Sequence, residues 1–306
     1  MKYAMIITGA LSAWIPCSMQ AAITGLDEVS TSWSRVDYAN NGIADPTADS
    51  NGQDAEELVG SSTLGVLFTD FNDQGDNDDS NDVISFRTRH AETKNGGTDF
   101  TSNLYIGIDA DKDFVIDAYV GVNTSGNSAE IFIANPDYGS TKKPNANNSV
   151  DSSKLDTNYV LVETITYLPA SGGNVSWRAV TDADTAGAGE SLDLDNGGNT
   201  DYYLSFQFNF QALATVLETN SATQGDTVYK ETELRYVVGT STQNNTFNKD
   251  IGGLDGNSLF GELYENVGAI SELTFASGGP VVSVPEPATS SMLALGLFGL
   301  LQRRKR

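Results

Sequence analysis

Four aspartates in one short stretch have the spacing of cation ligands. Asp109, Asp111, Asp113 and Asp117 occupy positions 1, 3, 5 and 9 of the segment DADKDFVID. Alternate residues of a tight loop can turn their carboxylates toward one point, and Ca²⁺ is bound by about six to eight oxygens. The spacing predicts a Ca²⁺ site at these four residues. The alternative is an acidic hairpin tip that contributes only solubility.

This loop resembles the calcium loops of EF-hand and dockerin proteins, with two departures. Phe114 stands where those loops place a turn-forming Gly, and Val120 stands where they place a bidentate Glu. The flanking residues also alternate as strands do, so the loop is not an EF-hand. We expect a β-hairpin held by Ca²⁺, with backbone carbonyls, water or a distant carboxylate completing the ligand shell.

Two further acidic stretches repeat the pattern less cleanly. Asp76, Asp78 and Asp82 lie in one of them, and Asp193, Asp195 and Asp201 surround Gly197 and Gly198 in the other. Acidic turns rich in Asn and Gly are common in exported β proteins. Ordinary loops are therefore the favoured interpretation of both, and cation binding is the alternative.

The residues offer little to a catalytic mechanism. His90 is the only histidine, and no nucleophile-elbow motif G-x-S-x-G occurs. We expect His90 on the surface beside Arg87 and Arg89, and we predict no catalytic residues and no zinc site. Carboxylate pairs for glycoside hydrolysis stay open, because spacing along the chain does not fix separation in space.

Two tryptophans bear on carbohydrate binding. Trp33 and Trp177 could present flat rings on which sugars stack, but in strands with apolar neighbours a tryptophan is more often part of the core. The core interpretation is the favoured one, and the platform is the alternative.

The elements that must position these side chains read as short strands. Leu104 to Val122 alternates apolar residues on both sides of the acidic turn and predicts a β-hairpin. A second hairpin is predicted from Tyr159–Leu168 and Asn174–Val180. Further strands are predicted around Trp33 and at 64–68, 83–90, 130–134, 202–210, 232–240, 259–264 and 270–275, and one helix at 211–218. In the strand at 83–90, alternation of apolar with polar residues predicts one wet face.

This pattern defines the fold class. Many short strands separated by turn signals, with one short helix, indicate an all-β protein, an antiparallel β-sandwich or jelly roll. Crossover helices for a parallel sheet are missing from the pattern. We expect one extracellular β domain over residues 23–280.

Composition restricts the partners. The chain has 17 Lys and Arg against 41 Asp and Glu, and residues 23–280 alone have 12 against 40. A surface with this excess of negative charge repels nucleic acid and anionic lipid and attracts cations. Nucleic acid is therefore not an expected partner.

The N-terminus indicates export. Met1 and Lys2 precede an apolar stretch, and Ala21 and Ala22 offer a cleavage point, which predicts a signal peptide over residues 1–22. Pro16 before Cys17 fits a lipoprotein signal poorly. Since Cys17 is the only cysteine and precedes the cut, the mature chain would have neither a thiol nor a disulfide.

The C-terminus predicts a sorting signal over residues 281–306. Val284, Pro285, Glu286 and Pro287 form a stiff extended segment, residues 288–301 are uncharged and mostly apolar, and four cations follow: Arg303, Arg304, Lys305 and Arg306. Fourteen residues form a short transmembrane helix, with the cations on the cytoplasmic side. The tail resembles the PEP-CTERM signal, which implies exosortase as a partner and transient membrane anchorage. Three segments of the body, residues 107–122, 201–210 and 235–253, also loosely resemble uncharacterised exported bacterial β proteins.

Together these features predict an exported, exosortase-sorted protein of the cell surface or extracellular matrix, stabilised by Ca²⁺, with a structural or adhesive role. The alternative is a jelly roll that binds or cleaves extracellular polysaccharide, using Trp33 or Trp177 and a carboxylate pair.

Overall fold

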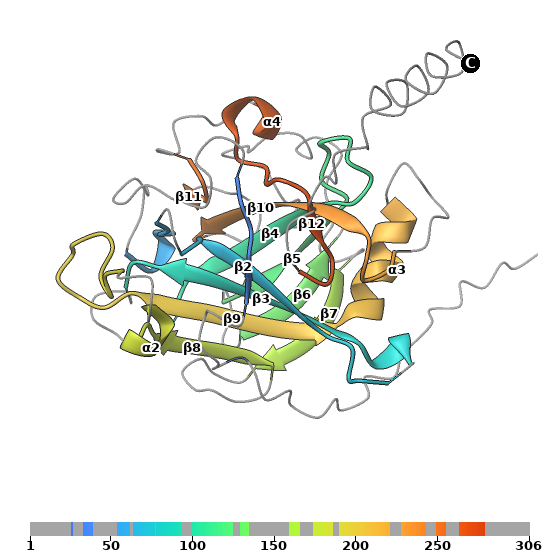
Figure 1. Ribbon diagram of the computed structural model, residues 1–306, viewed down its shortest axis with the longest axis horizontal. Coiled ribbons are helices and arrows are strands. Elements are labelled where there is room, and N and C mark those ends of the chain that lie inside the picture. The colour runs from blue at the N-terminus through green and yellow to red at the C-terminus, as the bar shows by residue number, and fades with distance from the viewer. Residues whose placement is uncertain are drawn as a thin grey trace, which may run out of the picture.

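A computed structural model of the 306-residue chain consists mainly of two antiparallel sheets (Figure 1). It describes residue 26 and residues 33–38, 54–61, 64–76, 78–92, 100–124, 129–134, 159–165, 174–185, 190–220, 228–242, 249–254 and 263–278. The predicted signal peptide and sorting tail lie outside these residues. Within them, none of the helices has the length and apolar character needed to cross a membrane.

The first sheet has five strands in the order β1-β2-β3-β9-β8. All of its neighbouring strands are antiparallel, and β3 pairs with β9 along its whole length. Its strands are β1 (Ser34–Arg35), β2 (Leu67–Asn72), β3 (Val83–His90), β8 (Val175–Ala179) and β9 (Tyr202–Asn209).

The second sheet has the order β11-β10-β4-β5-β6-β7, and β12 also pairs with β10. The predicted hairpin is its centre: β4 pairs with β5 in the register Leu104 opposite Val122. Its strands are β4 (Asn103–Asp109), β5 (Ala118–Asn123), β6 (Ala129–Ala134), β7 (Tyr159–Ile165), β10 (Glu233–Ser241), β11 (Asp250–Ile251) and β12 (Thr274–Phe275).

The two sheets share one hydrophobic cluster. In Figure 1 the sheet that contains β2, β3 and β9 lies in front of the sheet that contains β4, β5 and β10. The rings of Phe86 on β3 and Tyr236 on β10 meet edge to face, with centroids 5.9 Å apart. Other members of the cluster include Ile84, Leu204 and Phe206 from the first sheet and Ile106, Val120, Ile133 and Val238 from the second. With no cysteine after Cys17, this burial has to stabilise the fold without disulfides.

One longer helix closes an end of this core. Helix α3 (Phe210–Asn220) follows β9 directly and buries Phe210, Leu213, Ala214 and Leu217, which recur at helical spacing. Asn209 accepts a hydrogen bond from the backbone N–H of Ala212 at 3.2 Å, as an N-cap does. The helix predicted at 211–218 is therefore confirmed. Short turns of helix also occur: η2 (Asp54–Glu56), η3 (Asp79–Asn81), α2 (Asp182–Thr185) and α4 (Tyr264–Val267).

The prediction of an all-β protein with antiparallel sheets is confirmed in its coarse form, while the assignment to a sandwich or jelly roll stays a prediction. The second predicted hairpin is wrong. Strand β7 pairs with β6 in one sheet, and β8 pairs with β9 in the other, so the two neighbours in sequence belong to different sheets. The strand predicted at 259–264 is also wrong at its described end, because Tyr264 begins α4.

The predicted wet face of β3 is buried. Ser85, Arg87 and Arg89 lie under a second apolar layer on the outer face of the first sheet, which includes Trp33, Phe68, Val180 and Tyr203. The Arg87 guanidinium stacks on Trp33, 4.1 Å from its ring centroid, and donates to Ser205 Oγ at 2.8 Å and to the Leu26 carbonyl at 2.6 Å. Polar residues can alternate into the interior here because hydrogen bonds and aromatic faces satisfy them.

Candidate metal centre

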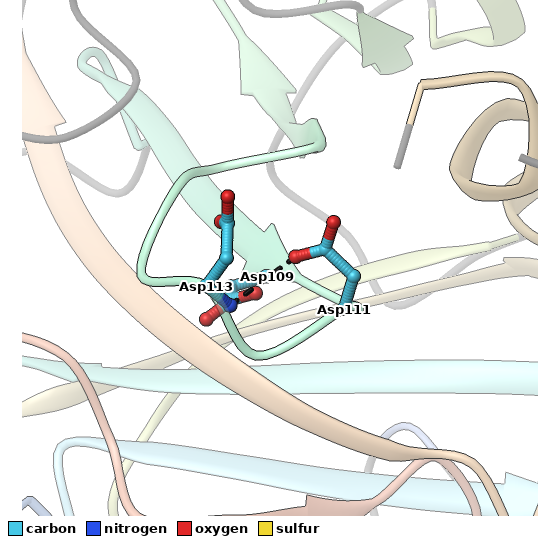
Figure 2. A group of neighbouring side chains, drawn as sticks. All are labelled: Asp109, Asp111 and Asp113. Carbon is cyan, nitrogen blue, oxygen red and sulfur yellow. Dashed lines mark hydrogen bonds between the residues drawn. The ribbon is translucent and has the colours of Figure 1, made fainter. Parts of the chain in front are cut away.

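The predicted cation loop lies between two central strands. Strand β4 ends at Asp109 and β5 begins at Ala118, and Asp117 donates its backbone N–H to the Ile108 carbonyl at 2.7 Å, which closes the turn. Figure 2 shows the side chains of Asp109, Asp111 and Asp113 around this turn. The loop is thus fixed at both ends by paired strands.

Three of the four predicted ligands converge. One carboxylate oxygen from each of Asp109, Asp111 and Asp113 lies within 4.8 Å of the other two. Asp109 is buried, Asp111 is half-buried and Asp113 is exposed, so the group of three extends from the protein interior to the solvent. Three carboxylates so close repel one another, and a divalent cation between them would relieve that repulsion.

The backbone of the loop wraps around Asp109. Its carboxylate accepts hydrogen bonds from the backbone N–H groups of Lys112 at 2.7 Å and Phe114 at 3.1 Å. Both donors have positive φ, 68° and 64°, a conformation that is costly for residues other than glycine. Phe114 therefore makes the sharp turn that a Gly makes at the same position in EF-hand and dockerin loops. Its ring lies 4.3 Å from the Arg235 guanidinium, which helps to hold it there.

Burial makes the Asp109 carboxylate hard to ionise. Burial raises the pKa of Asp109 to about 6, against the lowering effect of the two backbone N–H groups, and Asp111 raises it further. The Arg235 Nη1 atom lies 3.8 Å from Asp109 Oδ2, too far for a hydrogen bond, and lowers the pKa only weakly. A bound cation would favour the ionised form and bring this pKa down.

The fourth predicted ligand occupies a different position. Asp117 is buried, and its Oδ2 atom accepts a hydrogen bond from the backbone N–H of Ala110 at 2.8 Å. Its carboxylate is not part of the convergent group of three. Burial raises the pKa of Asp117 to about 7, and the negative charges of Asp111 and Asp109 add to that effect. Asp117 thus holds the start of the loop in place through its hydrogen bond with the Ala110 N–H.

A second acidic group converges in the loop before β9. Oxygens of Asp193, Asp195 and Asp201 lie within 4.8 Å of one another. Here a buried arginine is already present: Arg89 Nη2 lies 2.6 Å from Asp201 Oδ2, and Arg89 Nε donates to the same oxygen at 2.8 Å. Burial raises the pKa of Asp201 to about 7 although Arg89 lowers it.

The third acidic stretch does not converge in this way. Asp76 accepts hydrogen bonds from the Asp78 backbone N–H at 2.8 Å and from Asn81 Nδ2 at 3.0 Å, and these bonds lower its pKa. Asp78 caps η3 by accepting from Ser80. Asp82 is buried, which raises its pKa. These aspartates shape a turn, as the favoured interpretation predicts.

His90 is a core residue, so its predicted place on the surface is wrong. It is fully buried, its Nε2 lies 2.8 Å from Thr88 Oγ1, and its Nδ1 lies 3.1 Å from the Ala55 carbonyl. Burial lowers the pKa of His90 to about 3, which keeps the ring neutral. The ring packs edge to face against Phe100 and Trp177.

Both candidate sugar platforms are interior as well. Trp177 is 5% exposed and packs between His90, Phe100 and Tyr202, and Trp33 is 7% exposed and lies against Arg87. Their ring faces are covered by protein, so the core interpretation is confirmed and neither ring is available for stacking on a sugar.

The sequence reasoning missed the Arg89–Asp201 pair. Its two members are 112 residues apart, and Arg89 was assigned to the solvent face of β3. It noted a likeness between the two convergent loops, but it did not note that both carry aspartates at positions 1, 3 and 9, counted from Asp109 and from Asp193. That shared spacing is visible in the sequence and could have linked the two loops.

Comparison with known families identifies one segment. Residues 283–306 match the PEP-CTERM protein-sorting motif. The match covers the predicted Pro-Glu-Pro segment, apolar run and basic end, so it confirms the sorting signal: this is an exported protein sorted by exosortase. Comparison with curated proteins and with solved structures gave no match.

Proposed function

We propose that the protein is a non-catalytic structural or adhesive component of the cell surface or extracellular matrix, stabilised by Ca²⁺ bound at the loop of residues 109–117. The observation that carries the proposal is the convergence of Asp109, Asp111 and Asp113 at the end of β4. The sorting motif supports an extracellular place of action, where Ca²⁺ is abundant and a chain without a disulfide needs another stabiliser.

In this proposal the three converging carboxylates are direct ligands, and backbone carbonyls and water complete the shell. Asp117, the fourth ligand expected from the sequence, keeps the loop in place through Ala110. Ca²⁺ is favoured over Mg²⁺, because Mg²⁺ demands a small, near-octahedral shell that a loop of mixed carboxylate exposure does not offer. Extracellular polysaccharide is the proposed neighbour of the protein, met through its acidic surface and bridging cations.

A Ca²⁺ titration followed by unfolding tests the metal site. Ca²⁺ at ~100 times its dissociation constant should raise the free energy of unfolding by about 2.7 kcal/mol. Asp111→Asn with Asp113→Asn should abolish most of that response and leave the Ca²⁺-free protein equally or slightly more stable, because repulsion is relieved. The matched control is Asp76→Asn with Asp78→Asn, which removes the same charge from exposed residues.

The outcomes separate the sites clearly. If the Asp111 and Asp113 variant keeps the full Ca²⁺ response, the ion binds elsewhere, at 76–82 or 193–201, and the assignment to this loop is wrong. Loss of the response in the control variant alone would place the ion at 76–82.

For sorting, we propose that the chain is anchored transiently in the membrane by residues 288–301 and is cut close to Pro285, Glu286 and Pro287. The prolines hold this segment extended just outside the bilayer. Intact-mass measurement of the mature protein gives the cut. Recovery of a chain that still ends at Arg306 from a host with a working exosortase would contradict this proposal.

A further inference from the structure

The segment that leads to the sorting tail is attached to one end of β10. Strand β12 pairs with β10 in the register Glu233 opposite Phe275 and Leu234 opposite Thr274. Beyond the strand, Ala276 donates its N–H to the Thr232 carbonyl and Ser277 donates to the Lys230 carbonyl, both at 2.8 Å. The chain is therefore held against the body as far as Gly278, the last described residue.

Gly278 lies against the first strand of the body. A Cβ atom placed on Gly278 would lie 2.9 Å from Ser34 Oγ, so Gly278 is in contact with β1. We call the end of the body formed by Ser34, Arg35, Tyr229, Lys230 and Gly278 the tail-root surface. It lies at the Glu233 end of β10, opposite the end at Ser241.

The link from this surface to the sorting motif is short. Six residues lie between Gly278 and Pro285, and a fully extended chain spans at most about 25 Å from Gly278 to Pro285 and about 35 Å from Gly278 to Ala288. The apolar run begins at Ala288. While that run is in the membrane, the tail-root surface cannot be farther from the bilayer than this link allows.

The side chains of the tail-root surface suit a headgroup layer. Tyr229 is 55% exposed and is, among the described residues, the most exposed large hydrophobic side chain. The side chains of Arg35 and Lys230 are 51% and 38% exposed. Tyr is enriched at membrane–water interfaces, and long basic side chains can anchor there as well. Their contacts with Asp37 at 3.3 Å and Asp73 at 3.6 Å are exposed ion pairs, which are weak and exchange readily with other partners.

We propose that the tail-root surface lies against the lipid headgroups while the sorting tail is inserted, so that β10 points its Glu233 end toward the membrane and its Ser241 end away from it. The proposal rests on the membrane anchorage proposed above and adds the orientation of the folded body. Asp37, Asp73 and the exposed Glu231 lie beside the basic side chains of this surface, so the proposal rests on the attachment of the tail root, the length of the link and the exposed Tyr229, and not on a positive net charge.

Two single-cysteine variants test the orientation in the full chain. Cys17→Ser removes the only native thiol, and a fluorophore is then attached at Glu231→Cys, which leaves Tyr229 in place, or at Thr242→Cys. Both positions are exposed, and they lie beyond opposite ends of β10, a nine-residue strand that spans roughly 30 Å at ~3.3 Å per residue. The proteins are reconstituted into phosphatidylcholine vesicles that contain a headgroup nitroxide lipid, and flotation measures insertion.

We expect the probe at position 231 to be quenched several-fold more strongly than the probe at position 242. A Gly/Ser insertion of about 20 residues between Gly279 and Pro280 should remove most of the difference, because it lets the body move away. Equal quenching, or stronger quenching at 242, in vesicles that carry the floated protein overturns the orientation alone. Failure of the chain to float with the vesicles overturns the anchorage as well.

Discussion

The loops at 109–117 and 193–201 share a backbone pattern, but they differ in the carboxylates that converge and in their surroundings. In both, the fourth and sixth residues have positive φ: 68° and 64° at Lys112 and Phe114, and 59° and 93° at Asn196 and Gly198. In both, the ninth residue is a buried aspartate that accepts a hydrogen bond from the N–H of the second, and a strand begins at the tenth.

The two loops differ in the positive charge that the body supplies. Arg89 is fully buried and lies 2.6 Å from Asp201, whereas Arg235 is partly exposed and lies 3.8 Å from Asp109. Arg89 also donates to the Ser191 carbonyl at 2.8 Å, so it is fixed within the loop. The loop at 193–201 thus has a permanent internal cation, and the loop at 109–117 has only a distant one.

This difference shows that an acidic spacing alone does not define a metal site. Carboxylates that converge have to be neutralised, and a folded chain can do so with its own guanidinium or with an ion from solution. Two loops with a similar backbone can therefore serve as a salt-bridged corner in one place and as a cation site in the other. The remaining tests alter one loop and use the other as its control.

Removing the internal cation should have the largest effect. Arg89→Met leaves Asp201 buried without its partner, and we expect the free energy of unfolding to fall by about 3 to 5 kcal/mol, as measured by urea denaturation. The matched change, Arg235→Met, should cost about 1 kcal/mol, because that pair is longer and partly exposed. The Arg89→Met variant should also be stabilised by Ca²⁺, because the carboxylates of Asp193, Asp195 and Asp201 would then need an external cation.

The double variant Arg89→Met with Asp201→Asn controls for lost packing. It should recover part of the lost stability and lose the new Ca²⁺ response. If Arg89→Met and Arg235→Met destabilise the protein equally, the proposed difference between the loops does not exist.

The pH dependence should next test the buried aspartates of the loop at 109–117. The pKa values of Asp109 and Asp117 are about 6 and about 7, above those of an unfolded chain, so the folded state binds more protons than the unfolded state between about pH 4 and pH 7. Stability from these groups is present at low pH and is lost as pH rises through that window, by up to ~1.4 kcal/mol per pH unit for each group.

Urea denaturation with a chelator present, repeated across this pH range, measures the effect. Asp117→Asn should lose less stability than the natural chain as pH rises. The difference between the two proteins isolates Asp117, because carboxylates with lowered pKa values contribute equally to both. Saturating Ca²⁺ should reverse the contribution of Asp109 and leave that of Asp201 in place, since Asp201 already has Arg89. Parallel pH profiles for Asp117→Asn and the natural chain would count against this account.

Local patterns in the sequence predicted most strands but not their partners. The strand at 83–90 was predicted with its observed ends, and the hairpin of β4 and β5 was predicted because its apolar alternation changes at an acidic turn. The hairpin of β7 with β8 was predicted wrongly, because proximity in sequence favours a hairpin, whereas β7 pairs with β6 in one sheet and β8 pairs with β9 in the other.

The candidate site also has a part that could be predicted from the sequence and a part that could not. The convergence of Asp109, Asp111 and Asp113 follows from alternate spacing on a tight turn and could be predicted. The burial of Arg87 and Arg89 could not, because their partners Ser205 and Asp201 lie 118 and 112 residues away. Alternation says which residues share a face, but only the tertiary structure says whether another layer covers it.

The smallest expected effect concerns the sixth residue of each loop. Gly198 has φ of 93°, and a Cβ atom there would meet nothing within 4 Å, so the cost of Gly198→Ala comes from the backbone alone. We expect a loss of about 1 kcal/mol.

Phe114→Gly removes a comparable backbone strain, but it also removes the ring that stacks on Arg235 and adds freedom to the unfolded chain. These effects oppose each other, so the net change without Ca²⁺ should be under ~1 kcal/mol. Because glycine keeps the positive φ that brings the Phe114 N–H to Asp109, Ca²⁺ stabilisation should survive in Phe114→Gly, and thermal unfolding with and without Ca²⁺ measures it. If Phe114→Gly instead abolishes the Ca²⁺ response, the phenylalanine ring, and not the backbone shape that the two loops share, holds the carboxylates in place.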